Sequence, residues 1–470
     1  MTVIIGLEIH CQLNTKTKLF CGCSTDYRDD GPNTHVCPIC LGLPGTLPVT
    51  NKQAVLYALK VAKALHCKVP AFSEFARKNY FYPDLPKAFQ ITQYDKPLAL
   101  GGYIDNEAEN GGEKRVELTR IHMEEDPGRL VHKGSGDRGR YTLVDYNRSG
   151  VPLIEIVTEP QLSSPKEARR FLNKLRATLE YLGIYDSERE GSLRVDANIS
   201  IKGYERVEVK NITSYKGVEK ALTFEITRQK GMIRRNAQIV RETRHYQEAR
   251  GVTTSARSKE MEHDYRYFPE PDLAPLEVSS WVDEIPLPEL PDARRDRFVQ
   301  QYGISQNHAR TLTGDLKLAE FFEEIASDMP EIAAPWTADI LLGELNYRDM
   351  PVTKVPVPHY GALLLEVKKG SVTDTSAVEI LRLILNQVME GQQPEMPGEI
   401  IARLGLSKEK GDSIVDTVAS VLRENEAAVA DHRAGKAGAI NFLVGQVMKA
   451  TRGRADPKEI AKIIADLLKE

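Results

Sequence analysis

The strict alternation of apolar and polar residues in two stretches of this 470-residue chain restricts its fold more than any other feature. Residues 3–13 and 193–201 carry an apolar side chain at every second position, which is the period of a β-strand. Polar residues share the opposite face: Glu8, His10 and Gln12 in the first stretch, and Arg194, Asp196, Asn198 and Ser200 in the second. We therefore expect a sheet with one apolar and one polar face. The polar face either meets solvent or lines a concave site.

The order of the remaining patterns predicts an α+β fold. Residues 114–160 indicate successive strands, and Ser164-Pro165-Lys166-Glu167 is typical of a helix start. The proline-rich run PLPELP at 286–291 marks a linker, after which the segments are mostly helical. We expect an antiparallel-sheet domain at residues 1–291, a helical domain at 292–404 and a small helical tail at 405–470.

Carboxylates recur on the predicted strands. The triplet Glu124-Glu125-Asp126 ends one strand, and Glu8 and Glu155 lie within two others. Carboxylates repel one another, so gathering them at one point is costly unless a cation lies between them. A hard divalent ion with oxygen ligands fits that role, and phosphate chemistry is its common use. Alternatively, these acids are scattered and solvated.

Four of the six cysteines form two close pairs, Cys21-x-Cys23 and Cys37-x-x-Cys40. Pairs on separate turns suit tetrahedral binding of zinc by thiolates. Such a zinc ion would be structural, because four thiolates leave no open position for chemistry. The alternative is a set of reduced thiols without a metal.

Several function classes are excluded by what the sequence lacks. A net charge of -4 gives no global basic field, so any RNA binding must use local patches. The sequence contains no P-loop, no G-x-G-x-x-G after a strand and no convincing nucleophilic pair. We also expect a soluble, cytosolic protein, because the sequence shows no signal-peptide pattern and no apolar run of membrane-spanning length.

Long motifs throughout the chain are similar to one known family. They are GLEIHCQL, CPICLGLPGTLPV, KNYFYPDLPKAFQITQYD, HMEEDPGRL, VDYNRSGVPLIEIVTEP, SLRVDANISI, EVKNITS, HDYRYFPEPDL and GKAGAINFLVGQVMKATRGRADP. In these motifs the chain resembles the B subunits of aspartyl/glutamyl-tRNA amidotransferases. The resemblance implies a glutamine-synthetase-like cradle, a helical domain and a tail that contacts tRNA.

The family resemblance also implies an activity and partners. The B subunit would use ATP and Mg²⁺ to phosphorylate the side-chain carboxylate of misacylated Asp-tRNA(Asn) or Glu-tRNA(Gln). Ammonia would then displace phosphate to give the amide. The ammonia would come from glutamine hydrolysed on an amidase-type A subunit, and a small C subunit would complete a heterotrimer.

Specific residues receive roles from the same resemblance. The implied Mg²⁺ ligands are Glu8, His10, Glu125 and Glu155, and the implied catalytic residues are Glu124, Glu125, Lys78 and Lys87. Lys78 and Lys87 match positions beside the phosphate site and a channel mouth. The implied cofactor-binding residues are Asn147, Arg148, Arg194, Asp196 and Lys210. The implied zinc ligands are Cys21, Cys23, Cys37 and Cys40.

Two other functions remain open from the sequence. The chain could be a zinc-containing tRNA-binding adaptor without chemistry, but an adaptor has no reason to line a groove with carboxylates. It could also be an unrelated carboxylate–amine ligase, but its tail resembles an RNA-contacting module. The acidic strands therefore favour the amidotransferase function.

The cysteine pattern gives the first prediction. Elemental analysis of the purified chain should find about one zinc ion per chain, because four thiolates complete one tetrahedral site. A folded chain free of metal would contradict the zinc assignment.

Overall fold

The computed structural model describes residues 1–134, 141–186, 191–212, 214–256, 265–327, 329–409, 412–433, 436, 438–451 and 453–468. Some sequence features lie outside these ranges. They are residues 135–140, Thr213 in EVKNITS, the first two residues of HDYRYFPEPDL, and Gly435, Ala437 and Arg452 in GKAGAINFLVGQVMKATRGRADP.

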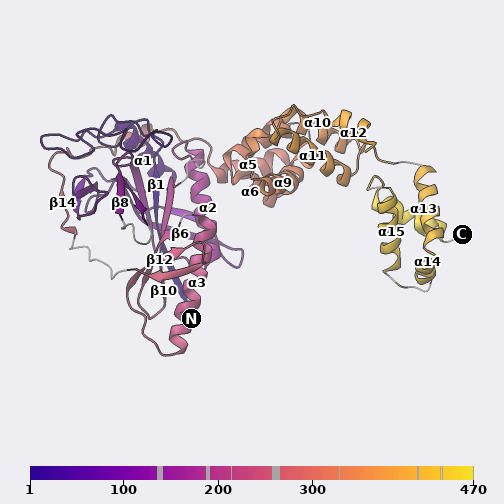
Figure 1. The fold of residues 1–470 in the computed structure, drawn as a ribbon, viewed down its shortest axis with the longest axis horizontal. Coiled ribbons are helices and arrows are strands. Elements are labelled where there is room, and N and C mark those ends of the chain that lie inside the picture. Colours follow the sequence, from indigo (N-terminus) through magenta and orange to yellow (C-terminus); the bar gives the residue numbers. More distant parts are fainter. Residues whose placement is uncertain are drawn as a thin grey trace. The chain divides into compact units, whose positions relative to one another are not determined.

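The chain contains two compact units, Met1–Pro291 and Asp292–Glu470. The first holds the strands and the second is helical (Figure 1). The predicted α+β class is therefore confirmed. A separate tail from residue 405 onward stays a prediction.

A large sheet forms the centre of the first unit. Within the described residues it has nine strands in the order β13-β12-β11-β10-β1-β9-β6-β4, with β5 paired to β6. All neighbours are antiparallel except β11 and β12. The strands are β1 (Val3–Gln12), β4 (Ala99–Leu100), β5 (Tyr103–Glu107), β6 (Glu113–Glu125), β9 (Pro152–Thr158), β10 (Leu193–Ile201), β11 (Val207–Ile212), β12 (Glu242–Gln247) and β13 (Val252–Ser255).

One face of this sheet is the apolar core. On β1 it carries Ile5, Leu7 and Ile9, each at most 1% exposed. Helices α1 (Lys52–Ala64), α2 (Pro165–Tyr181) and α3 (Tyr215–Arg234) contribute to the same core, and Figure 1 shows α2 and α3 beside the sheet. Each fully buried aliphatic side chain stabilises the fold by about 1.5–3 kcal/mol. This burial fixes which face of every strand is left for polar side chains.

Capping side chains set the helix starts. Ser164 Oγ accepts a hydrogen bond from the backbone N–H of Glu167, as the sequence predicts for α2. Helix α1 is capped by Asn51, whose side chain accepts from the N–H groups of Gln53 and Ala54. These caps satisfy N–H groups that have no partner within the helix.

Two smaller sheets and a short helix complete the first unit. One sheet has the order β14-β2-β3, and the other is the hairpin β7-β8. Their bounds are β2 (Ala76–Asn79), β3 (Phe89–Thr92), β14 (Phe268–Pro269), β7 (Arg129–Lys133) and β8 (Tyr141–Asp145); the helix is α4 (Trp281–Glu284). Strand β3 packs against β6, so its sheet lies beside the strand that ends in Glu124-Glu125.

The second unit is built from short helices. Its first part holds α5 (Pro291–Tyr302), α6 (Gln306–Thr313), α7 (Leu316–Ala326), α8 (Pro330–Pro335), the π-helix η3 (Trp336–Leu341), α9 (Leu342–Arg348), the 3-10 turn η4 (Val352–Lys354), α10 (Val357–Lys368), α11 (Asp374–Met389) and α12 (Pro397–Leu404). Then follow α13 (Asp412–Glu424), α14 (Glu426–Arg433), α15 (Ala439–Ala450) and α16 (Pro457–Leu467), with a small apolar cluster around Val418, Leu443 and Ile460. Among the described residues, no helix is long and apolar enough to cross a membrane.

The core of the first unit yields a prediction. Leu175→Ala should lower the free energy of unfolding by about 2–5 kcal/mol, because Leu175 is fully buried on α2. The control Leu100→Ala deletes the same atoms from a side chain that is 45% exposed and should cost under about 1 kcal/mol. Hydrogen exchange of the β1 and β10 amides in the full chain measures both values, and equal losses would contradict this assignment of the core.

Candidate active site

A row of polar residues crosses adjacent strands on the face opposite the core. In the register of the sheet, His10 on β1 lies directly opposite Glu155 on β9, and Glu155 lies opposite His122 on β6. On the other side of β1, His10 lies opposite Arg194 on β10. Because side chains directly opposite in a sheet share a face, the row brings these four residues together from distant parts of the chain.

Three of these strands contribute to a tight cluster. His10 Nε2 lies 3.3 Å from Glu155 Oε2 and 3.4 Å from Glu124 Oε1. Ligand atoms of His10, Glu124 and Glu155 all lie within 4.8 Å of one another, close enough for one metal ion. The side chains of Glu124 and Glu155 are only 6% and 14% exposed. Two carboxylates are thus held together with little water.

Imidazoles compensate the charge of these carboxylates. Burial would raise the pKa of Glu155, but His122 and His10 hold it well below its usual range. Burial would lower the pKa of His10, but Glu155 and Glu124 outweigh burial and raise it to about 9. His10 therefore places positive charge between the two carboxylates.

His122 is a member of this site that we did not predict from the sequence. It is 3% exposed, and its Nε2 lies 3.2 Å from Glu155 Oε2. Its Nδ1 is buried without a hydrogen-bond partner. The sequence signal was present, because His122 precedes Glu124 by two positions and so lies on the same face of the strand.

Glu124 and Glu125 point to opposite faces of the sheet, as neighbours on a strand must. Glu125 is 4% exposed and forms an ion pair with Lys87. Its Oε1 also accepts a hydrogen bond of 3.0 Å from the backbone N–H of Ile91. The structure therefore brings Glu124 to His10 and Glu155 and places Glu125 elsewhere. Metal binding by Glu125 stays a prediction from the family.

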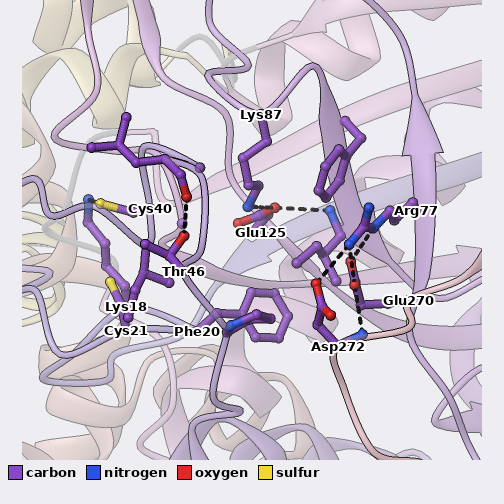
Figure 2. Close-up of a pocket in the computed structure, with 17 residues that line it drawn as sticks. Lys18, Phe20, Cys21, Cys40, Thr46, Arg77, Lys87, Glu125, Glu270 and Asp272 are labelled. Carbon is purple, nitrogen blue, oxygen red and sulfur yellow. Dashed lines mark hydrogen bonds and ion pairs between the residues drawn. The ribbon is translucent and has the colours of Figure 1, made fainter.

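Glu125 and Lys87 border a cavity of about 200 Å³. Figure 2 shows the Lys87–Glu125 pair between two walls. One wall belongs to the cysteine loop, with Lys18, Cys21 and Cys40, and the other contains Arg77, Glu270 and Asp272. Arg77 donates two hydrogen bonds of 2.7 Å to Glu270. These bonds tie the segment around β14 to β2, so this wall is fixed by a bidentate ion pair.

A glycine of the cysteine loop lets Lys87 reach Glu125. Gly42 has a φ of +66°, and a Cβ there would lie 2.3 Å from Lys87 Cγ. Any larger residue would therefore be strained and would displace the lysine stem.

Lys78 lies under a group of tyrosines beside the carboxylate cluster. Its Nζ is 4.8 Å from the ring centre of Tyr265 and 5.7 Å from that of Tyr80. Burial would lower the pKa of Lys78, but the Glu124 carboxylate and the nearby tyrosines raise it. Lys78 therefore remains an ammonium close to Glu124 and supplies positive charge on this side of the site.

Glu8, another predicted ligand, lies in a second acidic cluster. Its carboxylate is within 4.8 Å of oxygens of Asp196 and Glu208. Lys210 Nζ lies 2.7 Å from Asp196 Oδ2 and 3.4 Å from Glu208 Oε1. The predicted residues Asp196 and Lys210 thus form an ion pair with each other. Asp196 lies opposite Glu8, two positions along β1 from His10 and on the same face of the sheet.

The other predicted nucleotide contacts hold loops in this structure. Asn147 Oδ1 accepts from the N–H of His35, and its Nδ2 donates to the carbonyl of Gly31. Two further hydrogen bonds, 2.9 and 2.7 Å long, run from Arg148 to the carbonyl groups of Pro127 and Gly128. Arg194 donates to Asp126 Oδ1 at 2.8 Å. These contacts fix the turn after Glu125 and the cysteine loop, and direct contact with a nucleotide stays a prediction.

The four predicted cysteines converge. Ligand atoms of Cys21, Cys23, Cys37 and Cys40 lie within 4.8 Å of one another. A tetrahedral zinc site with Zn–S bonds of about 2.3 Å needs sulfur atoms about 3.8 Å apart, so the donor set fits zinc. A hydrogen bond from Cys21 outweighs burial and, with the N–H of Cys37 and the ammonium of Lys18, lowers the pKa of Cys40 to about 4. A thiolate is thus available to a metal ion at neutral pH.

Lys18 is a second residue that sequence reasoning missed. It is fully buried, and its Nζ donates to the carbonyl of His35 at 2.8 Å. The same Nζ lies 3.7 Å from Cys40 Sγ and 3.4 Å from the carbonyl oxygen of Tyr146. A lysine at the end of the polar run NTKTK gives no local signal for such burial.

Two protein-family models match most of this chain. Residues 3–283 match the GatB/GatE catalytic domain, and residues 320–468 match the GatB domain. The chain is 66% identical to two proteins named as the B subunit of aspartyl/glutamyl-tRNA(Asn/Gln) amidotransferase, from Methanoregula boonei and Methanospirillum hungatei. It is 48% identical to the protein of that name from Haloarcula marismortui. Each alignment covers 100% of this chain and 98% of the relative.

Lys18 gives a prediction about the cysteine site. Lys18→Met should weaken zinc affinity about 10- to 100-fold, because it removes the cation beside Cys40 and the donor that holds His35. Zinc affinity is measured by competition with a chromogenic chelator. Lys16→Met, which changes an exposed lysine on the same loop, should leave the affinity unchanged. Equal affinities in the two variants would exclude a role for Lys18.

Proposed function

Because the chain belongs to the GatB family, we propose that it activates the side-chain carboxylate of a misacylated tRNA with ATP at the cluster of His10, Glu124 and Glu155. The chain is a subunit of the glutamine-hydrolysing ligase that transamidates Asp-tRNA(Asn) or Glu-tRNA(Gln). One observation supports the proposal most strongly: residues far apart in the sequence converge as two carboxylates and an imidazole on one face of the sheet.

The donor set of this cluster fits a hard divalent cation such as Mg²⁺. Carboxylate oxygens are its preferred protein ligands, and Glu124 and Glu155 supply two carboxylates to the cluster. When bound, Mg²⁺ would neutralise phosphate oxygens of ATP. Of the residues predicted from the family, His10 and Glu155 fit this role, and we propose Glu124 in place of Glu125.

The chemistry needed here is activation of a poor acyl donor. A carboxylate does not release an oxide ion to ammonia, whereas an acyl phosphate releases phosphate. The substrate carboxylate attacks the γ-phosphorus of ATP, and ADP leaves. Ammonia then attacks the acyl carbon, inorganic phosphate leaves and the ammonium nitrogen loses a proton. Lys78 is positioned to attract the incoming phosphate charge, because its ammonium lies beside Glu124.

We further propose that ammonia reaches the acyl phosphate from the other side of the Glu124-Glu125 pair. The 200 Å³ cavity borders Lys87 and Glu125, one residue away from the carboxylate cluster. Ammonia must stay unprotonated to act as a nucleophile, so a mostly enclosed route suits it. The cysteine loop forms one wall of this route, and a structural zinc ion would hold that wall in place.

The assignment of partners follows the family. The chain is one subunit of a multi-subunit enzyme. We propose an amidase-type A subunit as the source of ammonia and a small C subunit as the third member. Residues 1–291 would form the cradle, residues 292–404 the helical domain, and residues 405–470 the tail that contacts tRNA. The cytoplasm, where aminoacyl-tRNA is used, is the compartment we propose.

Glu124 and Glu125 provide a test with a matched control. In the reconstituted complex with Asp-tRNA(Asn) or Glu-tRNA(Gln), Glu124→Gln should reduce kcat for tRNA-dependent ADP formation at least about 100-fold. Glu125→Gln, the same change on the opposite face, should retain ADP formation and reduce the yield of amidated tRNA. Binding of tRNA, measured by filter retention, should stay unchanged in both variants.

The outcomes separate the possible functions. Full ADP formation in Glu124→Gln would remove the assignment of Glu124 to the phosphoryl-transfer step. Equal loss of ADP formation in both variants would contradict separate roles for the two faces. It would support Glu125 as a metal ligand.

A further inference from the structure

Exposed cations gather at one end of the large sheet, far from the cluster of His10. Strand β10 runs antiparallel to β11, and β11 runs parallel to β12, so the end of β10 and the starts of β11 and β12 lie together. Two segments meet at this end: the turn after β10, residues 202–206, and the connection from α3 to β12, residues 234–241. Figure 1 labels β10, β12, α3 and the N-terminus at this end of the first unit.

The charge of these two segments is unbalanced. They hold one acidic side chain, Glu205, and five cationic ones, which gives a formal charge of +4 in a chain whose total is -4. All five cations are exposed, and among the described residues none of them forms an ion pair. These five residues form the cationic patch, which consists of Lys202, Arg206, Arg234, Arg235 and Arg241. Such a patch attracts a multiply charged anion from outside the chain.

The backbone under the cationic patch is fixed, so the patch has a defined shape. The N–H of Lys202 donates a hydrogen bond of 2.9 Å to the carbonyl of Thr2, and the N–H of Ala237 donates one of 3.0 Å to the carbonyl of Met232. Ile239 is 3% exposed and anchors its segment in the core. A groove of about 590 Å³ runs between the two segments. The patch therefore surrounds a preformed concave surface.

The cationic patch also continues onto the face of the candidate active site. Arg206 lines a cavity of about 340 Å³ together with Gly6 and Ser200. Gly6 lies on the same face as His10, because the two residues are four positions apart on β1. Val3, at the patch end of β1, precedes His10 by seven residues, so about 23 Å separate the patch from the His10 cluster. A long ligand held at the patch could thus reach the site.

We propose that the cationic patch binds the sugar–phosphate backbone of RNA, in particular the double-stranded stem next to the aminoacylated 3′ end of the tRNA substrate. Four of the five cations are arginines, whose guanidinium groups donate paired hydrogen bonds to phosphate. The single-stranded 3′ end would cross the polar face to the His10 cluster. The choice of tRNA rests on the proposed function, whereas binding of duplex RNA does not.

The surface suits a phosphate backbone better than a protein partner. Protein interfaces have an apolar core in which charged residues are depleted. In these two segments the exposed large apolar side chains are Tyr204 and Val240, one on each segment, and the cations surround them. Contacts to phosphate, by contrast, come mainly from arginine, lysine and hydroxyl groups, and Tyr204 adds a hydroxyl group to the groove.

A double variant in the reconstituted complex tests the proposal. Arg206 and Arg241 directly precede β11 and β12, and they are neighbours because Val207 pairs with Glu242. Fluorescence anisotropy measures binding of whole tRNA and of an RNA minihelix that contains only the acceptor stem, at several salt concentrations. Arg206→Gln/Arg241→Gln should weaken both RNAs about tenfold. It should also reduce the slope of log affinity against log salt by about 2, because each lost phosphate contact contributes about 1.

Matched variants separate contact from net charge. Arg115→Gln/Arg169→Gln removes the same charge from exposed arginines outside the patch and should leave affinity and slope unchanged. Arg206→Lys/Arg241→Lys keeps both charges and should retain most of the salt slope. At saturating tRNA, kcat for ADP formation should be unchanged in Arg206→Gln/Arg241→Gln while KM rises, because the patch is distant from the reacting atoms.

Each other result would overturn the proposal. Unchanged affinity and slope in Arg206→Gln/Arg241→Gln, or an equal loss in the control pair, would exclude a phosphate contact at the patch. Weaker tRNA binding with unchanged minihelix binding would exclude the acceptor stem. Loss of partner subunits on gel filtration, with RNA affinity unchanged, would assign the patch to a protein. Minihelix binding needs neither ATP nor a metal ion, so this test and the Glu124→Gln assay can fail separately.

Discussion

Repulsion between carboxylates on one face of a sheet is the constraint on which the rest of this structure depends. The face holds Glu8, Glu124, Glu155, Asp196 and Glu208, and each has little contact with water. Such a gathering is unstable unless cations lie among the acids. His10 and Lys210 supply part of that charge.

Because side chains alternate along a strand, two adjacent residues belong to two different regions of the molecule. Glu124 belongs to the polar face with His10, and Glu125 to a cavity beside the cysteine loop with Lys87. A substrate activated on one side and a nucleophile arriving on the other would therefore be separated by the thickness of one strand end.

The cysteine loop acts as a scaffold for that arrangement. Its thiols converge on one point, and buried Lys18 connects them to the carbonyl groups of His35 and Tyr146. Asn147 holds the same loop through Gly31 and His35. Gly42 then allows Lys87 to approach Glu125. The family resemblance assigns Asn147 to cofactor binding. Its contacts in the structure show that it also holds the cysteine loop in place.

The sequence by itself determined the alternating strands, the α2 cap at Ser164, the α+β class and the cysteine set, because each depends on spacing within a few residues. It also indicated which acids share a face within one strand. Only the tertiary structure decided which acids meet across strands, because register is set by packing of the apolar face against α1, α2 and α3. That register joins Glu124 to His10, places Glu8 beside Asp196 and Glu208, and places His122 opposite Glu155.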